Sequence, residues 1–286
     1  MSLDSSSSVS PPPSSTTSDR FVLYSYWRSS CSYRVRIVLN LLNINYEYRS
    51  IHLLKSEQSS KEYLQINPSG IVPTLIIYPH ANNSPPIVLT QSLAIIEYLV
   101  QTYHNSSVAS SSTSQSQSSP SSPPSPIINI FPSDPFLQYH ARSLSYIVAC
   151  DIQPPANSRH LQQIQKLTQS EEIKNDWAKQ IIENGLQAFE TALNKYYQSQ
   201  SQSNHQHHPT SLLSASTNNT NSNDNKYCLG NNTVTIADIC LIPQLYNARR
   251  FNVNLSQYPH CSRIDEECQK LAAFQLALPE AQPDKV

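Results

Sequence analysis

The sequence predicts two folded domains, an α/β domain at residues 20–103 and an all-helical domain at 127–286. Apolar residues in the first region switch between strand-like and helix-like spacing. The resulting order is strand, helix, strand, short helix, two strands and helix. The second region carries helical patterns only. A chain of 286 residues is long enough for two domains of ordinary size.

Three segments differ in composition from these domains. They are a tail at 1–19, a Ser/Pro-rich linker insertion at 104–126, and a Ser/Asn/Gln-rich insertion at 198–225. They lack the apolar residues needed to offset the entropy of ordering, so we expect them to be disordered. The run His205-Gln206-His207-His208 lies in the third segment. Compositional drift explains this run better than a metal site, because no carboxylate or Cys framework surrounds it.

The bulk composition argues against several classes of function. The formal net charge is −1 and the aromatic residues are not set among Lys and Arg, so no nucleic-acid surface is expected. The N-terminus resembles neither a secretory signal nor a transit peptide, and no stretch is apolar enough to span a bilayer. We therefore expect a cytoplasmic protein without membrane contact. Glycine occurs only at Gly70, Gly185 and Gly230, too sparsely for a glycine-rich phosphate loop.

The strand and helix signals of the first domain follow one another without long gaps. One helix face is formed by Val35, Val38, Leu39 and Leu42, which fall at i, i+3, i+4 and i+7. The other predicted elements are strands at 21–26 and 46–51, a short helix at 61–66, a hairpin of strands at 73–77 and 87–89, and a helix at 91–103.

The second domain shows clear helix starts. Asp134-Pro135 combines a cap with a proline in the first turn, and Thr235-Ile236-Ala237-Asp238 has the form of a capping box. The apolar run 239–242 behind this box is typical of a buried central helix. The predicted helices are 135–150, 171–197, 236–248 and 261–270.

A cluster of hydroxyl residues and a thiol lies between the first strand and the first helix, at residues 28–34. The hydroxyls suit helix capping. A helix N-terminus also favours a thiolate, whether the sulfur belongs to the protein or to a ligand. Of the six cysteines, none forms a C-x-x-C pair, and we expect free thiols. Cys31 is the one thiol placed at this helix start.

Two further motifs each allow two interpretations. Residues 67–73 predict either a turn before an edge strand or a cis Val72-Pro73 bond that presents its backbone to an extended peptide. Gln91-Ser92 predicts either a simple helix cap or a helix N-terminus that holds a ligand carboxylate. Each signal is weak alone, and their order along one strand–helix unit is more specific.

These motifs, in this order, resemble the thioredoxin-like domain of zeta-class glutathione transferases. The run Ser29-Ser30-Cys31-Ser32-Tyr33-Arg34-Val35-Arg36 is close to the mark of that class. The helical region resembles the family as well, at residues 151–154, 235–244, 247–251 and 273–284. The resemblance leaves out only the three biased segments. Tyr33 stands where many relatives have Trp.

The resemblance implies a fold, a cofactor and an activity. The fold is an N-terminal thioredoxin-like domain followed by an all-helical C-terminal domain, the cofactor is glutathione, and the assembly is a homodimer. Zeta-class proteins include maleylacetoacetate isomerases of phenylalanine and tyrosine breakdown, which act on a small diacid. Two alternatives remain: glutathione conjugation or dehalogenation of small α-halo acids, and a binding module without catalysis.

The resemblance also implies residue roles. Ser29 would hydrogen-bond the glutathione sulfur, supported by Ser30 and Cys31. Val72 would pair with the backbone of glutathione beside a cis Pro73. Arg28 and Arg250 are candidates for the carboxylates of the diacid. Further glutathione contacts are implied for Ser32, Tyr33, Arg34, Gln58, Gln91, Ser92, Gln153, Asn157, Ser158 and Arg159.

Overall fold

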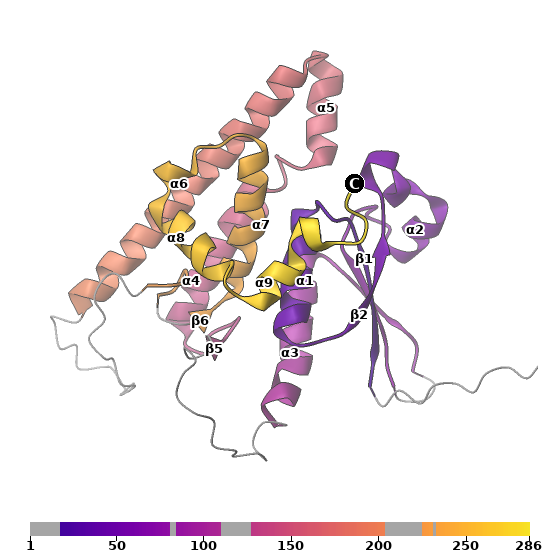
Figure 1. Ribbon diagram of the computed structural model, residues 1–286, viewed down its shortest axis with the longest axis horizontal. Helices are drawn as coiled ribbons and strands as arrows, with labels where there is room; N and C mark the ends of the chain where they lie inside the picture. The colour runs from indigo at the N-terminus through magenta and orange to yellow at the C-terminus, as the bar shows by residue number, and fades with distance from the viewer. Residues whose placement is uncertain (1–17, 81–83, 110–126, 204–224, 231–232) are drawn as a thin grey trace, which may run out of the picture.

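The computed structural model describes residues 18–80, 84–109, 127–203, 225–230 and 233–286. Figure 1 shows a small sheet with its helices, joined along one side to a helical bundle. This is the predicted succession of an α/β domain and an all-helical domain. Most of the three biased segments, including the run of histidines at 205–208, lies outside the described residues.

The first domain is built on a four-stranded mixed sheet of order β2-β1-β3-β4. β1 pairs in parallel with β2, and β3 pairs antiparallel with both β1 and β4. A parallel pair needs a crossover, which the first helix supplies. The strands are β1 Arg20–Ser25, β2 Tyr46–Ser50, β3 Thr74–Tyr78 and β4 Ile87–Thr90.

The helices of this domain complete the predicted order. They are α1 Ser30–Leu41, α2 Lys61–Ile66 and α3 Ser92–Ala109. α3 runs past the boundary expected at Tyr103, because the next six residues contain neither proline nor glycine to end it. The short helix α2 has the predicted bounds.

The second domain is helical, as predicted, apart from one short strand pair. Two-residue strands β5 Ile127–Ile128 and β6 Thr233–Val234 pair in parallel and were not predicted. The helices are α4 Pro135–Tyr146, α5 Ser158–Thr168, α6 Glu171–Ser203, α7 Ile236–Arg250, α8 Pro259–Cys268 and α9 Ala272–Ala277.

Three stretches of this domain differ from the prediction. Helix α6 continues to Ser203, past the end expected at residue 197 and into a segment expected to be disordered. The helix expected at 135–150 changes at Ile147 into a π-helical segment that ends at Ile152. Helix α5 was missed, because Pro154 and Pro155 obscure the start that follows them. Its signal was present: Asn157 caps the helix by accepting a hydrogen bond from the His160 N–H at 3.1 Å.

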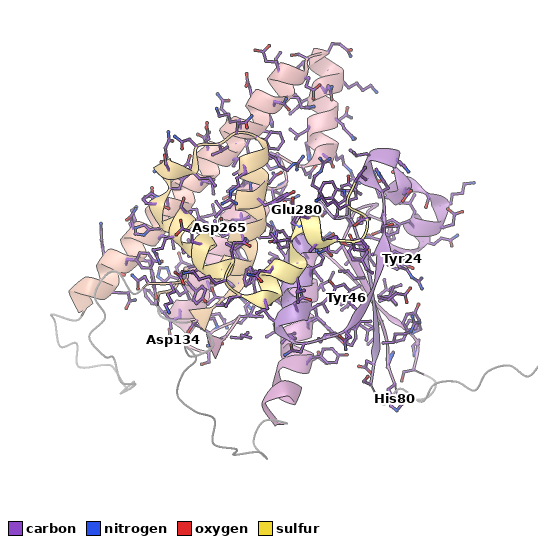
Figure 2. All side chains as sticks on the ribbon, in the orientation of Figure 1. Tyr24, Tyr46, His80, Asp134, Asp265 and Glu280 are labelled. Atoms are coloured by element: carbon purple, nitrogen blue, oxygen red, sulfur yellow. The ribbon has the colours of Figure 1, made fainter. Side chains whose placement is uncertain are left out.

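The predicted helix caps are confirmed. Asp134 accepts a hydrogen bond from the Leu137 N–H at 2.8 Å at the start of α4 (Figure 2). At α7, the buried Asp238 carboxylate accepts bonds from the Thr235 N–H at 2.8 Å and the Cys228 N–H at 2.8 Å. Burial raises the pKa of Asp238, and these hydrogen bonds oppose the rise.

Helix α1 is enclosed by both domains. It packs against α3 of its own domain and against α7 and α9 of the helical domain. The face formed by Val35, Val38, Leu39 and Leu42 is buried, as predicted. These residues belong to one apolar core that continues from the sheet into the helical domain. The two domains are therefore fused through α1 rather than joined by a loose hinge.

The buried Arg36 and the C-terminal segment fasten the start of α1. Arg36 Nη2 donates to the Trp27 carbonyl at 3.1 Å, and its Nε donates to the Ala277 carbonyl at 3.1 Å. Asp284 accepts a hydrogen bond from the Trp27 N–H at 3.1 Å. The loop between β1 and α1 is thereby held from both sides.

No helix within the described residues is long and apolar enough to cross a bilayer. The His, Cys, Asp and Glu side chains of the same residues form no group that could hold a metal ion.

Candidate active site

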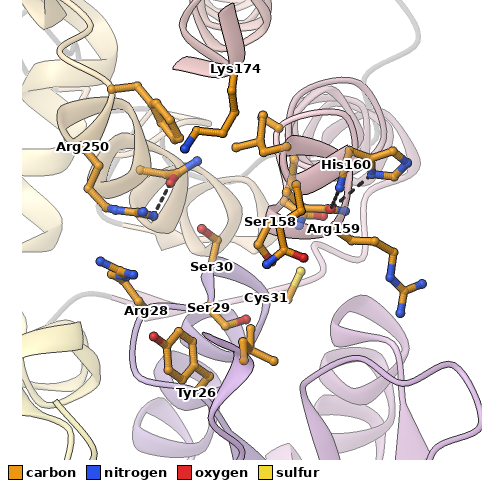
Figure 3. A pocket seen from close by; sticks show the side chains of 18 of the residues that line it. Tyr26, Arg28, Ser29, Ser30, Cys31, Ser158, Arg159, His160, Lys174 and Arg250 are labelled. Atoms are coloured by element: carbon orange, nitrogen blue, oxygen red, sulfur yellow. Dashed lines mark hydrogen bonds between the residues drawn. The ribbon is translucent and has the colours of Figure 1, made fainter. Parts of the chain in front are cut away.

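A cleft of about 820 Å³ separates the N-terminus of α1 from helices α5, α6 and α7 (Figure 3). Its walls come from both domains, so neither domain forms it alone. Most of the predicted site residues line this cleft: Arg28, Ser29, Ser30, Cys31, Gln58, Val72, Gln91, Gln153, Asn157, Ser158, Arg159 and Arg250.

Ser29 is the N-cap of α1 and also faces the cleft. Its Oγ accepts a hydrogen bond from the Ser32 N–H at 3.2 Å. The hydroxyl proton of Ser29 has no acceptor within the described chain, so it is free to donate into the cleft. The neighbouring Ser30 hydroxyl instead donates to the Pro243 carbonyl of α7 at 3.4 Å. Ser29 can therefore cap the helix and bind a ligand at the same time. The Ser30 hydroxyl proton is already used in a bond to the protein.

The loop that ends at Val72 presents free backbone groups to the cleft. The Val72-Pro73 bond is cis, as one of the two interpretations predicted. Neither the N–H nor the C=O of Val72 makes a hydrogen bond within the described residues. The loop is fixed just before this point, because Tyr63 Oη and Asn67 Nδ2 each donate to the Ile71 carbonyl at 2.8 Å.

Arg159 connects this loop to the helical domain. Its Nη2 donates to the carbonyls of Ser69 and Gly70, at 3.0 Å each. Gly70 adopts a φ of +58°, and an added Cβ would lie 3.2 Å from the Gln58 carbonyl oxygen. The loop is therefore held in a left-handed turn that a guanidinium from the opposite domain caps.

The N-terminus of α3 forms another part of the wall. Gln91 lines the cleft with a left-handed backbone, φ +67°, which is unusual for a residue with a side chain. Its carbonyl accepts from the Ile95 N–H at 2.9 Å, so Gln91 caps the helix. Gln58 Oε1 is buried beside the cleft with no partner within the described residues. Such groups are expected to bind a polar ligand or water.

The far end of the cleft is rich in positive charge. Within the described chain, neither Arg28 nor Arg250 forms an ion pair with a carboxylate. Arg250 Nη1 donates to Asn247 Oδ1 at 2.9 Å. Burial lowers the pKa of Arg250, and the nearby charge of Arg28 lowers it further. Two like charges held together without a counter-ion favour a dianionic ligand.

Some residues implied for glutathione binding do not reach the cleft. Ser32 and Tyr33 lie one turn into α1, on faces that are buried in the core. Tyr33 packs edge-to-face on Tyr246 of α7, and its burial raises its pKa. Pro73 is buried behind Val72. These three residues shape the site from behind, and a direct contact with a ligand is not supported.

Arg34 and Ser92 also lie outside the cleft lining and are buried. They contact each other, since Arg34 Nη1 donates to Ser92 Oγ at 3.4 Å. Ser92 immediately follows Gln91, which does line the cleft. Arg34 therefore does not contact a ligand in the cleft directly. It reaches the cleft wall only through the residues that it contacts.

Lys174 lines the cleft as well, although no pattern in the sequence singles it out. Its side chain is 16% exposed, and its Nζ donates to Glu171 Oε1 at 2.8 Å. Figure 3 shows it directed from α6 toward the space near Arg250. Lys174 lies in a polar stretch of a helix, where a lysine is normally a solvated charge. Only the tertiary arrangement shows that this lysine lies in the wall of the cleft.

Comparison with protein families agrees with this geometry. Residues 28–102 match the family model described as glutathione S-transferase, N-terminal domain. The maleylacetoacetate isomerase of Dictyostelium discoideum is 34% identical, over 94% of this chain and 97% of that protein. The maleylacetoacetate isomerase of Mus musculus is 35% identical, over 92% and 94%.

Solved structures give the same result. A maleylacetoacetate isomerase from Anaeromyxobacter dehalogenans, with glutathione bound in its active site, is similar with a TM-score of 0.68 and 30% identity. The match covers 94% of this chain and 99% of that one. A bacterial maleylpyruvate isomerase, a zeta-class glutathione S-transferase, matches with a TM-score of 0.68 and 32% identity over 93% and 100%.

The contact of Arg159 with the loop at 69–70 is open to a direct test. Arg159→Ala removes two hydrogen bonds that cross the cleft, so we expect amide hydrogen exchange at residues 69–72 to become roughly tenfold faster. His160→Gln changes the next residue of α5 without touching the loop and serves as the control. Equal exchange rates in the wild type and Arg159→Ala would show that Arg159 does not hold the loop.

Proposed function

The chain belongs to the maleylacetoacetate isomerase family of zeta-class glutathione transferases, and we propose that it isomerises 4-maleylacetoacetate to 4-fumarylacetoacetate with glutathione. This function rests on one observation, which is the set of groups that line a single cleft. Three features face the same space: a capped helix N-terminus, the backbone of Val72, and two arginines. Within the described residues, the Ser29 hydroxyl proton, the Val72 backbone groups and the two arginines have no hydrogen-bond acceptor, backbone partner or acidic partner, respectively.

The residues present fit glutathione. A tripeptide needs a partner for its backbone, and the unpaired N–H and C=O of Val72 supply one. Its γ-glutamyl carboxylate suits the N-terminus of α3, where Gln91 lines the cleft and Ser92 lies buried directly behind it. Its sulfur suits the N-terminus of α1, where Ser29 has a hydroxyl proton to donate. Gln58, Gln153, Asn157, Ser158 and Arg159 complete the proposed site.

Glutathione, when bound, supplies a thiolate that can add reversibly to the cis double bond of the substrate and so permit rotation about it. The Ser29 hydroxyl and the positive end of α1 favour this thiolate over the thiol. Arg28 and Arg250 hold the substrate carboxylates and so position the double bond of the substrate beside Ser29 and Cys31. Their charge also stabilises the negative charge that develops on the substrate.

The primary test is the turnover of maleylacetoacetate by the purified protein, with and without glutathione. Conversion to fumarylacetoacetate that requires glutathione is the expected result. Turnover of dichloroacetate under the same conditions measures the halo-acid alternative. Absence of both reactions, with glutathione binding intact, would contradict an enzymatic role.

Ser29→Ala tests the thiolate site. Removing the hydroxyl should lower kcat by roughly 10²–10³-fold while weakening glutathione binding much less, because the lost hydrogen bond is directed at the thiolate. The variant also loses a helix cap, at a cost of about 1 kcal/mol. Ser29→Thr keeps both the cap and the hydroxyl and should recover most of the rate. Unchanged turnover in Ser29→Ala would show that this role is wrongly assigned.

Arg250→Met tests the site for the diacid. We expect KM for maleylacetoacetate to rise roughly 100-fold with little change in KM for glutathione, because one charged hydrogen-bonding partner is lost. Arg249→Met is the matched control. Arg249 is adjacent on α7 but pairs with Asp265 of α8 (Figure 2). A similar rise in KM for both variants would place the diacid elsewhere.

We also propose a cytoplasmic homodimer that acts in phenylalanine and tyrosine breakdown. The dimer is supported by one face of α4, where Phe136, Tyr139 and Tyr146 are 55%, 63% and 45% exposed. Their spacing of three and seven residues puts them on one side of the helix. Exposed aromatic side chains on one face are typical of a protein interface.

Tyr139→Glu tests this interface. A charge in the centre of the aromatic face should convert the dimer to a monomer, as measured by light scattering after size-exclusion chromatography. Tyr78→Glu, at the end of β3 and away from α4, is the control. A dimer that survives Tyr139→Glu, or a monomeric wild type, would contradict the proposed interface.

A further inference from the structure

Arg34 lies beneath the site, between the N-termini of two helices. Its side chain is 2% exposed. Its Nη1 is 3.4 Å from Ser92 Oγ, at the start of α3, and 3.9 Å from Cys31 Sγ, at the start of α1. Cys31 is partly exposed and lines the cleft beside Ser29. One guanidinium therefore touches both ends of the proposed glutathione site.

The charge of Arg34 has no counter-ion in the part of the chain that the structure describes. Within the described residues, no carboxylate lies at ion-pair distance from Arg34, and its Nε and Nη2 have no hydrogen-bond partner. Arg36, two residues along the same helix, shows the contrast: all of its nitrogens donate to neighbouring oxygens. A guanidinium keeps its charge near neutral pH. A buried charge is normally paired, so the absence of a partner indicates that the partner arrives with the ligand.

The charge of Arg34 acts on two thiols: Cys31, whose Sγ lies 3.9 Å from Nη1, and Cys240 on α7. The other groups that act on Cys240 are Cys31, Asp238 on the same helix and Cys150 on the π-helical segment. Burial raises the pKa of Cys240 to about 11, and the charge of Arg34 opposes this rise. Asp238 is occupied by donors from residues 228 and 235. The charge of Arg34 thus acts on sulfur in its surroundings without being neutralised by a carboxylate.

We propose that Arg34 is a positioning residue whose unpaired charge stabilises the thiolate of glutathione bound at Ser29 and Cys31. The inference rests on the proposed use of glutathione and adds a second source of thiolate stabilisation. Ser29 donates a hydrogen bond to the sulfur from the cleft side. Arg34 acts from inside the protein, through Cys31, without touching the ligand. The bound thiolate is the anion that this buried cation lacks.

The test is a titration of bound glutathione, followed by the ultraviolet absorbance of the thiolate, in the full-length protein. Arg34→Met removes the charge and keeps most of the volume. We expect the pKa of the bound thiol to rise by about one unit, because nearby charges cause shifts of this size. Turnover near neutral pH should then fall up to roughly tenfold and recover as the pH is raised. Arg34→Lys keeps the charge and should stay closer to the wild type.

A second ligand separates a charge effect from a structural one. S-methylglutathione has no ionisable sulfur, so its affinity should fall less in Arg34→Met than the affinity for glutathione. Equal losses for the two ligands, or an unchanged thiol pKa, would overturn the proposal. If Arg34→Met does not fold, Arg34→Gln is titrated in its place with the same criteria. The titration needs no maleylacetoacetate, so a failure of the isomerase assay would leave its result unaffected.

Discussion

The hydrogen bonds of Arg36 determine where the active-site helix starts. Its guanidinium donates to Ser25 Oγ, to the Trp27 carbonyl and to the Ala277 carbonyl, at 3.1–3.2 Å. These acceptors belong to the end of β1, the following loop and α9. The loop must therefore enter α1 at one fixed point, and Ser29 becomes the cap. The position of Ser29 relative to the groups across the cleft depends on this arrangement.

The site is built to receive negative charge at three points. Helix N-termini begin at Ser29 and Gln91, and the guanidinium groups of Arg28 and Arg250 occupy the far end. The carboxylates of Glu171 and Asp176 line the cleft, but within the described chain neither forms an ion pair with Arg28 or Arg250. Such a site attracts an anionic ligand strongly, because the ligand does not have to displace an internal ion pair. A peptide thiolate and a diacid match this distribution of charge better than a neutral substrate does.

Much of the site could be predicted because it depends on local signals. A helix start, an X-Pro bond and a second helix start singled out Ser29, Val72 and Gln91, and all three line the same cleft. Tyr33 was assigned to the ligand, but the helical turn directs it toward Tyr246, and adjacency in sequence does not reveal which face is buried. Lys174 was missed because its place in the cleft wall depends on how α6 packs against the other helices, which no local pattern encodes.

The return of the C-terminus to the first domain has a consequence for synthesis on the ribosome. Arg36 and the Trp27 N–H find their partners at Ala277 and Asp284, close to the last residue of the chain. While the nascent chain is still short of these residues, the Arg36 Nε and the Trp27 N–H lack these acceptors, and Arg36 keeps only its bonds to Ser25 and the following loop. The first domain is therefore expected to reach its final structure only after the residues up to Asp284 have been synthesised, although it is made first.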